Sequence, residues 1–452
     1  MTMRHESLVF KRVGEIRRSE VVAAFTYALD LTEGQPQGHS IRSCFIATTL
    51  AREIGLDAAA TGQVYYTALL KDLGCSSNAA RIHELYRADD LAFKQSWKTI
   101  APGLGSTLRF VLEQTAPGAP LKRRVAAVGR ILVNGRAIAQ EMIEARCTRG
   151  ADIARELRFS EGVSEGIYRL DEHWDGSGRP GGLRGHAIPL ASRLALLAQI
   201  TDVFHQAAGR RMAVEEVVRR ARTWLDPELV RAFVRVAEDQ RFWAQLESTA
   251  VDIRVAAMAP EETEEVDDDH LDAIAAAFGK VIDAKSPFTA GHSARVADYS
   301  EQLGARLGVL PTRLRRLRRA ATLHDVGKLG ISSAILEKPG QLDEQEWAAM
   351  RLHASHTQAI LGRIGALADL APIAASHHER LDGTGYPLGL DARALSRETR
   401  IITLCDYYDA LTADRPYRPA MPVERALAVM AEEVGRALDP EGFEALKAIV
   451  SG

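Results

Sequence analysis

The sequence predicts an almost entirely α-helical protein made of two related halves. Apolar residues recur three or four positions apart in VVAAFTYALDL (21–31), RLRRAATLHDVGKL (316–329) and ALAVMAEEV (426–434), which is the spacing of one helix face. Ala, Leu, Arg and Glu, all strong helix formers, dominate the composition, and alternating β-branched runs are scarce. Several motifs also occur twice along the chain. The predicted fold class is therefore all-α with a tandem repeat.

Length and composition fit a folded protein of two or three domains. The chain has 452 residues, of which 46% are hydrophobic and 26% charged, and its net charge is −3. This balance excludes a global basic field, so we expect no nucleic-acid partner. The stretch MTMRHESLVFKRVGE (1–15) lacks the apolar core of a signal peptide, and no run approaches the roughly 18 apolar residues of a spanning helix. We expect a cytoplasmic protein without a membrane partner, whose four cysteines are free thiols.

A change in composition divides the chain near its middle. The stretch ESTAVDIRVAAMAPEETEEVDDDH (247–270) becomes acidic and nearly free of large apolar residues from Pro260 onward. Such a stretch is typical of a linker or of an exposed helix start. We therefore expect a first domain over residues 1–247, an acidic linker over 248–269 and a second domain over 270–452.

The two halves read as diverged copies of one domain. LDEHWDGSGRPGGL (170–183) matches HHERLDGTGYPLGL (377–390), and LLKDLGC (69–75) matches TLHDVGK (322–328). The first copy carries about 46 extra residues within 76–160. Two repeats are too few for a solenoid, so this pattern predicts a tandem domain duplication.

The second copy carries histidines and carboxylates in an order typical of a metal centre. The candidate ligands are His292, His324, Asp325, His353, His377, His378 and Asp406. Neutral imidazoles and carboxylates are ligands that iron, manganese and zinc accept. Two such metals about 3.5–4 Å apart can share a hydroxide and hold a phosphoryl group for in-line displacement. Lys328 lies one helical turn from His324, where its charge could neutralise a phosphate.

A structural interpretation competes with this one. A lone histidine on an amphipathic helix is usually structural or solvated, and this is our interpretation of His270 and His356. The ordered pattern H…HD-x-G-K…H…HH…D between His292 and Asp406 favours a metal centre instead.

With these motifs the second half resembles the HD-GYP family of bacterial phosphodiesterases, which hydrolyse cyclic di-GMP. The matching stretches are HSARVADYSEQLGARLG (292–308), ATLHDVGKLGISSAILEKPGQLDEQEW (321–347), HHERLDGTGYPLGL (377–390) and DYYDALTADRPYR (406–418). The resemblance implies tandem HD-type helical domains, of which the second is the catalytic HD-GYP domain. It also implies the seven ligands given above, with Asp325 bridging the metals and Lys328 contacting the scissile phosphate. Gly385, Tyr386 and Pro387 would line the substrate groove, and Arg415 and Arg418 would bind substrate phosphates.

The resemblance further implies a cofactor and a reaction. Family members with a third metal tend to carry a glutamate where this chain has Phe288, so we expect two divalent ions, iron or manganese rather than zinc, nickel or magnesium. The implied reaction is attack of a metal-bridging hydroxide on phosphorus in line with the 3′-oxygen. Cyclic di-GMP would give linear pGpG, which some relatives convert on to GMP.

The first copy has lost most of this chemistry. His39 matches His292, Asp72 matches Asp325, and Asp202 is taken to match Asp406. The other matching positions differ: they are Lys71 for His324, Cys75 for Lys328, Leu170 for His377, Asp171 for His378 and Arg179 for Tyr386. No counterpart of His353 is found, because His83 lies too early. A lysine in a ligand position repels cations. The first domain is then either a dimerisation or packing module or a regulatory domain that binds a nucleotide or a partner.

Three functions follow from these residues. The main expectation is a cyclic di-GMP phosphodiesterase. An alternative keeps the metal centre and changes the substrate to cyclic GMP-AMP, which the GYP motif does not distinguish. The third is a non-catalytic cyclic di-GMP receptor or scaffold, against which the intact ligand set speaks. A homodimer and protein partners of a signalling pathway are further expectations.

Overall fold

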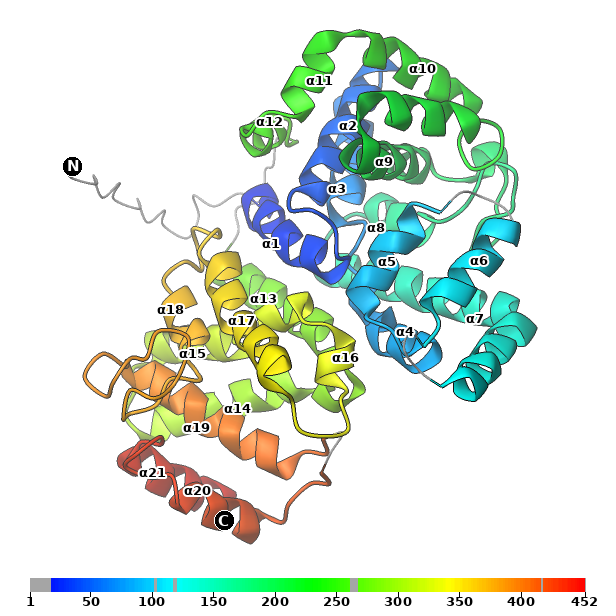
Figure 1. Ribbon diagram of the computed structural model, residues 1–452. Coiled ribbons are helices and arrows are strands. Elements are labelled where there is room, and N and C mark those ends of the chain that lie inside the picture. The colour runs from blue at the N-terminus through cyan, green and yellow to red at the C-terminus, as the bar shows by residue number, and fades with distance from the viewer. Residues whose placement is uncertain (1–17, 101–103, 117–119, 261–266, 416–417, 452) are drawn as a thin grey trace, which may run out of the picture.

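The protein is all-helical, as the sequence predicts. The computed structural model describes residues 18–100, 104–116, 120–260, 267–415 and 418–451, and within them it contains helices and a few isolated β-bridges but no strand (Figure 1). Residues 1–15, which lack the apolar core of a signal peptide, lie outside the described residues. No helix among the described residues has the length and apolar character needed to cross a bilayer.

The first half of the chain forms the helices coloured blue to green in Figure 1. Their bounds are α1 Arg18–Thr32, α2 His39–Glu53, α3 Ala58–Leu70, η1 Cys75–Asn78, α4 Ala79–Tyr86, α5 Asp90–Lys98, α6 Leu104–Gln114, α7 Leu121–Glu156, α8 Glu161–Tyr168, η2 Gly185–Ala187, α9 Leu190–Arg219, α10 Pro227–Glu238, α11 Gln240–Leu246 and α12 Val251–Ala257.

The second half forms the helices coloured light green to red. Their bounds are α13 Asp268–Asp283, η3 Pro287–Thr289, α14 His292–Arg306, α15 Pro311–Leu323, η4 Val326–Gly330, α16 Ser333–Leu336, α17 Glu344–Leu361, α18 Ala371–Ala375, α19 Arg397–Thr412, α20 Val423–Ala431 and α21 Pro440–Val450.

The start of each copy is built in the same way. Asp30 accepts hydrogen bonds from the backbone N–H and the hydroxyl of Ser40, and Asp283 accepts the same two bonds from Ser293. Asp30 and Ser40 each lie 253 positions before their counterparts, Asp283 and Ser293. A glycine with positive φ, Gly38 or Gly291, precedes the helix that opens with the first histidine of each copy. These matched contacts support the duplication expected from the sequence.

The extra residues of the first copy form a small subdomain with its own core. Helices α4, α5, α6 and the first turns of α7 occupy this insertion. A separate apolar cluster holds them together, in which Phe93 packs edge-on against Phe110 at 5.0 Å and at a tilt against Tyr86 at 4.3 Å between ring centroids. Burial of these rings gives the insertion its own hydrophobic stabilisation.

The expected linker is only partly free of regular structure. Residues 251–257 form α12, which packs on α2. Residues 261–266, the most acidic part, lie outside the described residues. Asp268 already belongs to α13 and pairs with Arg319 of α15.

The two copies pack against each other through their first helices. Helix α1 lies against η4 and α17 of the second half, and α13 lies against η1 and α7 of the first half (Figure 1). One continuous apolar core runs through both halves. Helix η4 directly follows Asp325, and η1 begins at Cys75, shortly after Asp72, so the contact between the copies lies close to both of these aspartates.

A buried ion pair joins the halves at this contact. The ammonium of Lys285 lies 2.7 Å from Asp90 Oδ2, and the other Asp90 oxygen accepts the backbone N–H of Ser333 at 2.7 Å. Both charged side chains are almost fully buried. Burial alone would raise the pKa of Asp90, but the charge of Lys285 outweighs it and lowers that pKa. The pair is thus ionised and fully desolvated.

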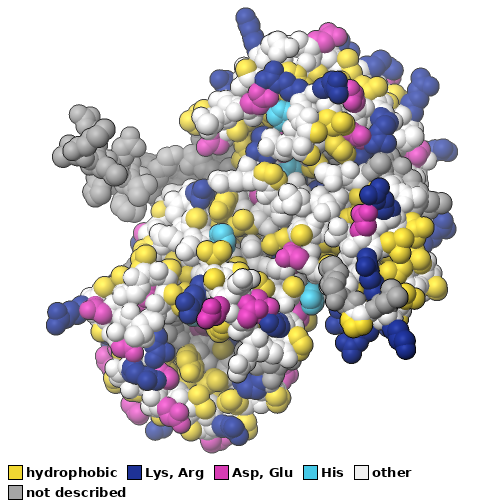
Figure 2. Space-filling view, in the orientation of Figure 1, with side chains coloured by type: hydrophobic (Ala, Val, Ile, Leu, Met, Phe, Trp, Pro, Cys, Tyr) yellow, Lys and Arg dark blue, Asp and Glu magenta, His cyan; other side chains and the backbone are white. Residues whose placement is uncertain are grey.

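The basic run RLRRLRR (313–319) is neutralised by neighbouring acids. Each arginine of α15 in this run pairs with a carboxylate: Arg313 with Glu398, Arg315 with Asp269 and Asp272, Arg316 with Asp369, Arg318 with Asp298 and Glu301, and Arg319 with Asp268 and Asp272. On the face drawn in Figure 2, basic and acidic side chains are scattered over both halves. This distribution gives no support for a nucleic-acid surface.

We expect Lys285→Met to lower the free energy of unfolding by about 3–5 kcal/mol, because it removes the ammonium nearest to the buried Asp90 carboxylate and leaves only Lys94, at 3.9 Å. Lys280→Met is the matched control, since Lys280 pairs across the same contact with Glu156 at 2.6 Å but both side chains are about half exposed. That loss should be about 0–1 kcal/mol. Urea unfolding of the full chain measures both, and equal losses would contradict a desolvated pair at Lys285.

Candidate metal centre and substrate groove

All seven predicted ligands converge in the second half. His292 opens α14, His324 caps the end of α15, and Asp325 precedes η4. The others come from three further segments: His353 from α17, His377 and His378 from the turn after α18, and Asp406 from α19. Their ligand atoms form overlapping groups of three, with all atoms of a group within 4.8 Å of one another. The structure thus brings the seven predicted residues together, and their role as metal ligands stays a prediction.

Asp325 lies between two sets of imidazoles. Its Oδ2 atom is 3.5 Å from His292 Nε2 and 3.3 Å from His324 Nε2. Its Oδ1 atom is 3.6 Å from His353 Nε2 and 3.7 Å from His377 Nε2. Each oxygen of one buried carboxylate thus faces its own set of ligand atoms, which is the arrangement that a carboxylate bridging two cations requires.

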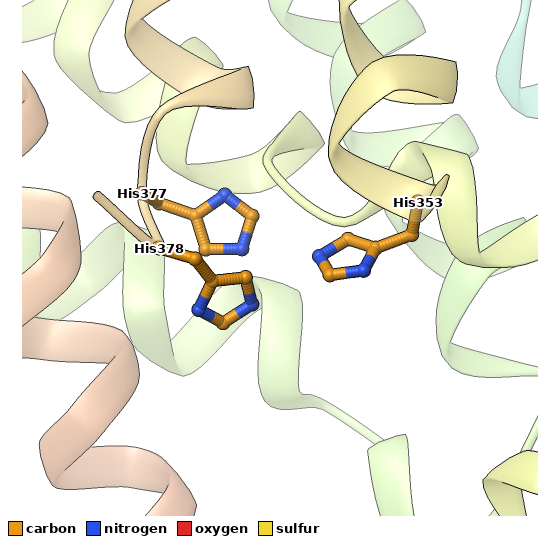
Figure 3. A group of neighbouring side chains, drawn as sticks. All are labelled: His353, His377 and His378. Carbon is orange, nitrogen blue, oxygen red and sulfur yellow. The ribbon is translucent and has the colours of Figure 1, made fainter. Parts of the chain in front are cut away.

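The set on the Oδ1 side consists of three histidines (Figure 3). The rings of His353, His377 and His378 turn toward a common point, with centroids 5.5 Å apart for His353 and His377 and 5.0 Å apart for His353 and His378. The set on the Oδ2 side contains His292, His324 and Asp406, whose Oδ1 atom lies 3.4 Å from His292 Nε2.

Backbone carbonyls fix the orientation of three of the rings. The Nδ1 atoms of His324, His353 and His377 lie 2.6–2.7 Å from the carbonyl oxygens three residues earlier, those of Ala321, Met350 and Ala374. Since a carbonyl only accepts, Nδ1 carries a proton and donates it, so the neutral form of each ring presents its lone pair on Nε2. The buried Nε2 atoms of these rings have no hydrogen-bond partner among the described residues.

A carboxylate orients the fourth ring, and sequence reasoning missed it. Asp409 Oδ2 lies 2.7 Å from His292 Nδ1, and Arg295 donates to both Asp409 oxygens at 2.6 and 3.0 Å. Asp409 lies one turn after Asp406 on α19, so it shares the helix face of that ligand. The signal in the sequence was the second aspartate of DYYDA, together with an arginine three residues after His292.

The centre is acidic enough to hold cations. Burial disfavours protonation of His292 and His324, yet the surrounding carboxylates outweigh it and raise their pKa values to about 10 and about 9. Burial lowers the pKa of His353 to about 3 and that of His378 to about 4, so these two rings are neutral ligands. Buried lone pairs without partners and a facing carboxylate suit a divalent metal site. That the metals are two ions of iron or manganese stays a prediction.

Lys328 lies beside the bridging carboxylate. Its Nζ atom is 2.5 Å from Asp325 Oδ2, and its side chain is partly exposed. A flexible ammonium at the rim of the centre is placed to meet a phosphate oxygen.

A groove of about 770 Å³ opens onto this centre, and the predicted substrate residues differ in their relation to it. His377, His378 and Asp406 lie in its wall, and so do Gly385 and Tyr386 of the GYP loop. Arg418 also lines it. The described lining includes neither Pro387 nor Arg415.

Two features of the groove's frame were not anticipated. The guanidinium of Arg418 donates to the carbonyl oxygens of Ala410, Leu411 and Pro419, which leaves it fewer donors for a phosphate. Buried Glu379 accepts the backbone N–H groups of Leu388, Gly389 and Leu390 and so holds the GYP loop in place. Glu172 holds the matching loop of the first copy through Gly181 and Leu183.

The structure corrects one pairing between the copies. Asp202 was taken as the counterpart of Asp406, but it contacts His39 Nδ1 at 2.7 Å and pairs with Arg42. These are the contacts of Asp409 with His292 and Arg295. The counterpart of Asp406 is therefore Gln199, three residues earlier. The two aspartates lie one turn apart on the same helix face, which is why the sequence alone misassigned them.

A second correction concerns His353, for which no counterpart was found. Gly327 lies directly beneath the backbone of His353, and Gly74 lies in the same way beneath Arg146 on α7. Arg146 therefore takes the place of His353, and it pairs with Asp171, which takes the place of His378. The insertion of the first copy lies between these matched positions and hid the correspondence.

Protein cations occupy the first centre. The Lys71 ammonium pairs with Asp72, and Lys98 lies 2.6 Å from Glu33 and 3.9 Å from Asp72. Glu33, Asp72 and Cys75 lie close enough to hold a metal, but these lysines already neutralise the two carboxylates. Burial and the charge of Lys71 lower the pKa of His39 to about 4, in contrast to that of His292. The prediction that this copy does not hold metal agrees with this charge pattern.

Comparisons with known proteins agree with the fold and the site. The sequence pattern of the family described as HD domain matches residues 136–229 and 277–442. The chain is 49% identical over 430 residues, 95% of its length and 94% of the relative's, to 3'3'-cGAMP-specific phosphodiesterase 3 of Vibrio cholerae serotype O1. The crystal structure of a cyclic GMP-AMP-specific phosphodiesterase of V. cholerae, V-cGAP3, matches 96% of the chain and 97% of its own with a TM-score of 0.66 and 43% identity. The cyclic di-GMP phosphodiesterase response regulator RpfG of Xanthomonas campestris is 35% identical over 176 residues, 37% of this chain and 45% of its own.

These matches contradict the main functional expectation from the sequence. Cyclic di-GMP was expected as the substrate with cyclic GMP-AMP as the alternative. The relative that matches nearly the whole chain is named for 3'3'-cGAMP, whereas RpfG, named for cyclic di-GMP, matches little more than a third. The alternative is better supported, because the relative named for 3'3'-cGAMP matches the chain over nearly its full length.

Asp409→Asn should lower metal affinity about 10- to 100-fold, because an amide lacks the negative charge that makes the His292 ring a stronger ligand and cannot accept from Arg295 through both of its polar atoms. Asp202→Asn is the matched control, since it breaks the same contact with His39 in the copy that lacks the ligands. Metal content after equilibrium dialysis, measured by mass spectrometry of the ions, compares the two variants. The role assigned to Asp409 fails if both retain the metal of the wild type.

Metal binding should release about two protons at pH 7, because His292 and His324 are protonated below their raised pKa values and a metal binds only the neutral rings. The apparent affinity therefore increases as the pH rises from 6 toward 9. Calorimetric titrations in buffers of different ionisation enthalpy count these protons. An affinity that does not change over this range would contradict the acidic centre.

Proposed function

Since the chain belongs to the HD-domain family and its second half to the HD-GYP group, we propose that it is a metal-dependent phosphodiesterase that hydrolyses 3'3'-cGAMP. The reaction type is inferred from the position of Asp325. One of its oxygens faces His292 and His324, and the other faces His353 and His377. The substrate assignment is supported by the similarity to the V. cholerae enzymes over nearly the full length.

The ligands in this proposal fall into two sets that share Asp325. His292, His324 and Asp406 would hold one ion, and His353, His377 and His378 the other. Two divalent cations, when bound, would lower the pKa of a water nucleophile and act as Lewis acids toward the phosphoryl oxygens. The buried imidazoles contribute neutral lone pairs, so the net positive charge of the ions is retained for the substrate phosphate.

The remaining groups act on the substrate. Lys328 would neutralise a phosphate oxygen at the rim of the centre, where its ammonium now contacts Asp325. Burial and the nearby Asp325 and Asp406 raise the pKa of Tyr386, so its phenol stays protonated and can donate a hydrogen bond from the groove wall. Hydrolysis forms a P–O bond to water and breaks the bond to the 3′-oxygen, which takes up a proton. The product is a linear dinucleotide.

The first half serves this site as a packing partner in the proposal. Helix α1 packs on η4, the turn that directly follows Asp325, and Leu31 of α1 lies close to Gly330. Through this contact the first half can hold Asp325 in place, which fits the packing role. Its domain bounds, and a homodimer or protein partners, stay predictions.

Hydrolysis of 3'3'-cGAMP by the purified full chain, loaded with iron or manganese, tests the proposal. We expect a linear product by chromatography and a faster reaction than with equimolar cyclic di-GMP in the same tube. Asp325→Asn and His324→Ala should each lower kcat at least about a hundredfold, because each removes part of the charge stabilisation, which is worth several kcal/mol.

His356→Ala is the control for a histidine lost from the same domain. His356 lies on α17 three residues after His353 but belongs to neither set of ligand atoms, so its replacement should leave kcat within about threefold. Tight binding of 3'3'-cGAMP without any product by metal-loaded protein would replace this proposal with a receptor function.

A further inference from the structure

One face of α17 forms a wall of the substrate groove next to the metal centre. Glu344, Trp347, Ala348 and Arg351 line the groove, and their spacing of three and four places them on one stripe of the helix. His353, a candidate ligand, follows two residues later. Trp347 exposes 45% of its surface. Its indole is therefore accessible to a ligand in the groove.

Arg351 has its hydrogen-bond donors unused. Among the described residues it has no hydrogen-bond or ion-pair partner, and its guanidinium lies over two aromatic rings, 5.6 Å from the centroid of Tyr386 and 6.0 Å from that of Trp347. The other arginines of the groove wall are engaged: Arg380 pairs with Glu433, and Arg418 donates to three backbone carbonyls.

A row of stacked groups leads from the metal centre to Trp347. The ring of His378 lies 4.8 Å from that of Tyr386, Arg351 lies over Tyr386, and Trp347 comes next along the row. A nucleotide whose phosphate lies at the metal centre would extend its base along this row. Purine rings stack on aromatic and guanidinium planes.

We propose that Trp347 and Arg351 form the subsite for the guanine base of the substrate. The purine stacks on the indole, and the guanidinium donates two hydrogen bonds to guanine O6 and N7, the pairing that its forked geometry matches. This inference rests on the proposed function, because it takes the cyclic dinucleotide as the ligand. It assigns the recognition of the base to Trp347 and Arg351, which are not metal ligands.

The rest of the groove lining offers different contacts. It contains Tyr407 with the apolar side chains of Ala410, Leu411, Ala437 and Leu438, and its guanidinium groups are the engaged ones of Arg380 and Arg418. These residues offer stacking and apolar contact but no unpaired guanidinium for guanine O6 and N7. Two unlike sets of lining residues suit a dinucleotide with two unlike bases.

Kinetics of two single variants of the full chain test the stacking contact. Trp347→Ala should raise KM for 3'3'-cGAMP about tenfold or more while kcat stays within about threefold, because a lost stacking contact weakens binding and leaves the ligands in place. Leu352→Ala is the matched control, since Leu352 is an exposed residue of the same helix outside the groove lining. Its KM should equal that of the wild type.

Competition by mononucleotides tests the guanine contact. Arg351→Ala should raise the inhibition constant of GMP about tenfold and leave those of AMP and ribose 5-phosphate within twofold. An equal loss for ribose 5-phosphate would make Arg351 a phosphate contact, and an unchanged GMP constant would remove its role, so either result overturns the subsite. A changed molecular mass of Trp347→Ala in solution would make this face a subunit contact and would also overturn it.

Fluorescence keeps this test separate from that of the proposed function. If the wild type fails to hydrolyse 3'3'-cGAMP, the proposed function falls, but GMP can still be titrated against the indole emission. Quenching in the wild type that is absent in Trp347→Phe supports the subsite. Identical quenching curves in the two proteins refute it.

Discussion

The second half of this protein depends on one buried carboxylate whose two oxygens face different sets of histidines. Asp325 presents Oδ2 to His292 and His324 and Oδ1 to His353 and His377, all at 3.3–3.7 Å. A desolvated carboxylate in such a position needs cations on both sides. The surrounding elements are arranged to meet this requirement: α14 begins at His292, α15 ends at His324, and α17 and the turn after α18 bring in the remaining histidines. The rings are held by backbone carbonyls or Asp409, so the centre is organised by the fold itself.

The first copy shows how the same fold meets the same requirement without metals. Its matching carboxylate, Asp72, is neutralised by Lys71 and Lys98, and the places of His353 and His378 are taken by Arg146 and Asp171, which pair with each other. Each lost ligand was thus replaced in a way that keeps the buried charges balanced. The outer contact of His39 with Asp202 and Arg42 survives because it supports the packing of α2 against α9, whether or not a metal is present.

Metal binding and the proposed base contacts share the same helices. Helix α17 carries His353 together with Trp347 and Arg351, and α19 carries Asp406 next to Tyr407. The candidate ligand positions admit few residue types, because metal binding restricts them. The groove residues beside them are not restricted in this way. The chain can therefore resemble relatives named for different cyclic dinucleotides.

The sequence by itself determined the helical fold class and indicated the duplication and the seven residues that cluster around Asp325, because these depend on short spacings and on residue types that chemistry restricts. Only the tertiary structure decided which aspartate of α19 orients His292 and that Arg146 takes the place of His353. It also showed that the Arg418 guanidinium donates its hydrogen bonds to backbone carbonyls. Those facts depend on which side chains meet across helices far apart in the chain. Two candidates one turn apart on a helix look alike in sequence, and only packing distinguishes them.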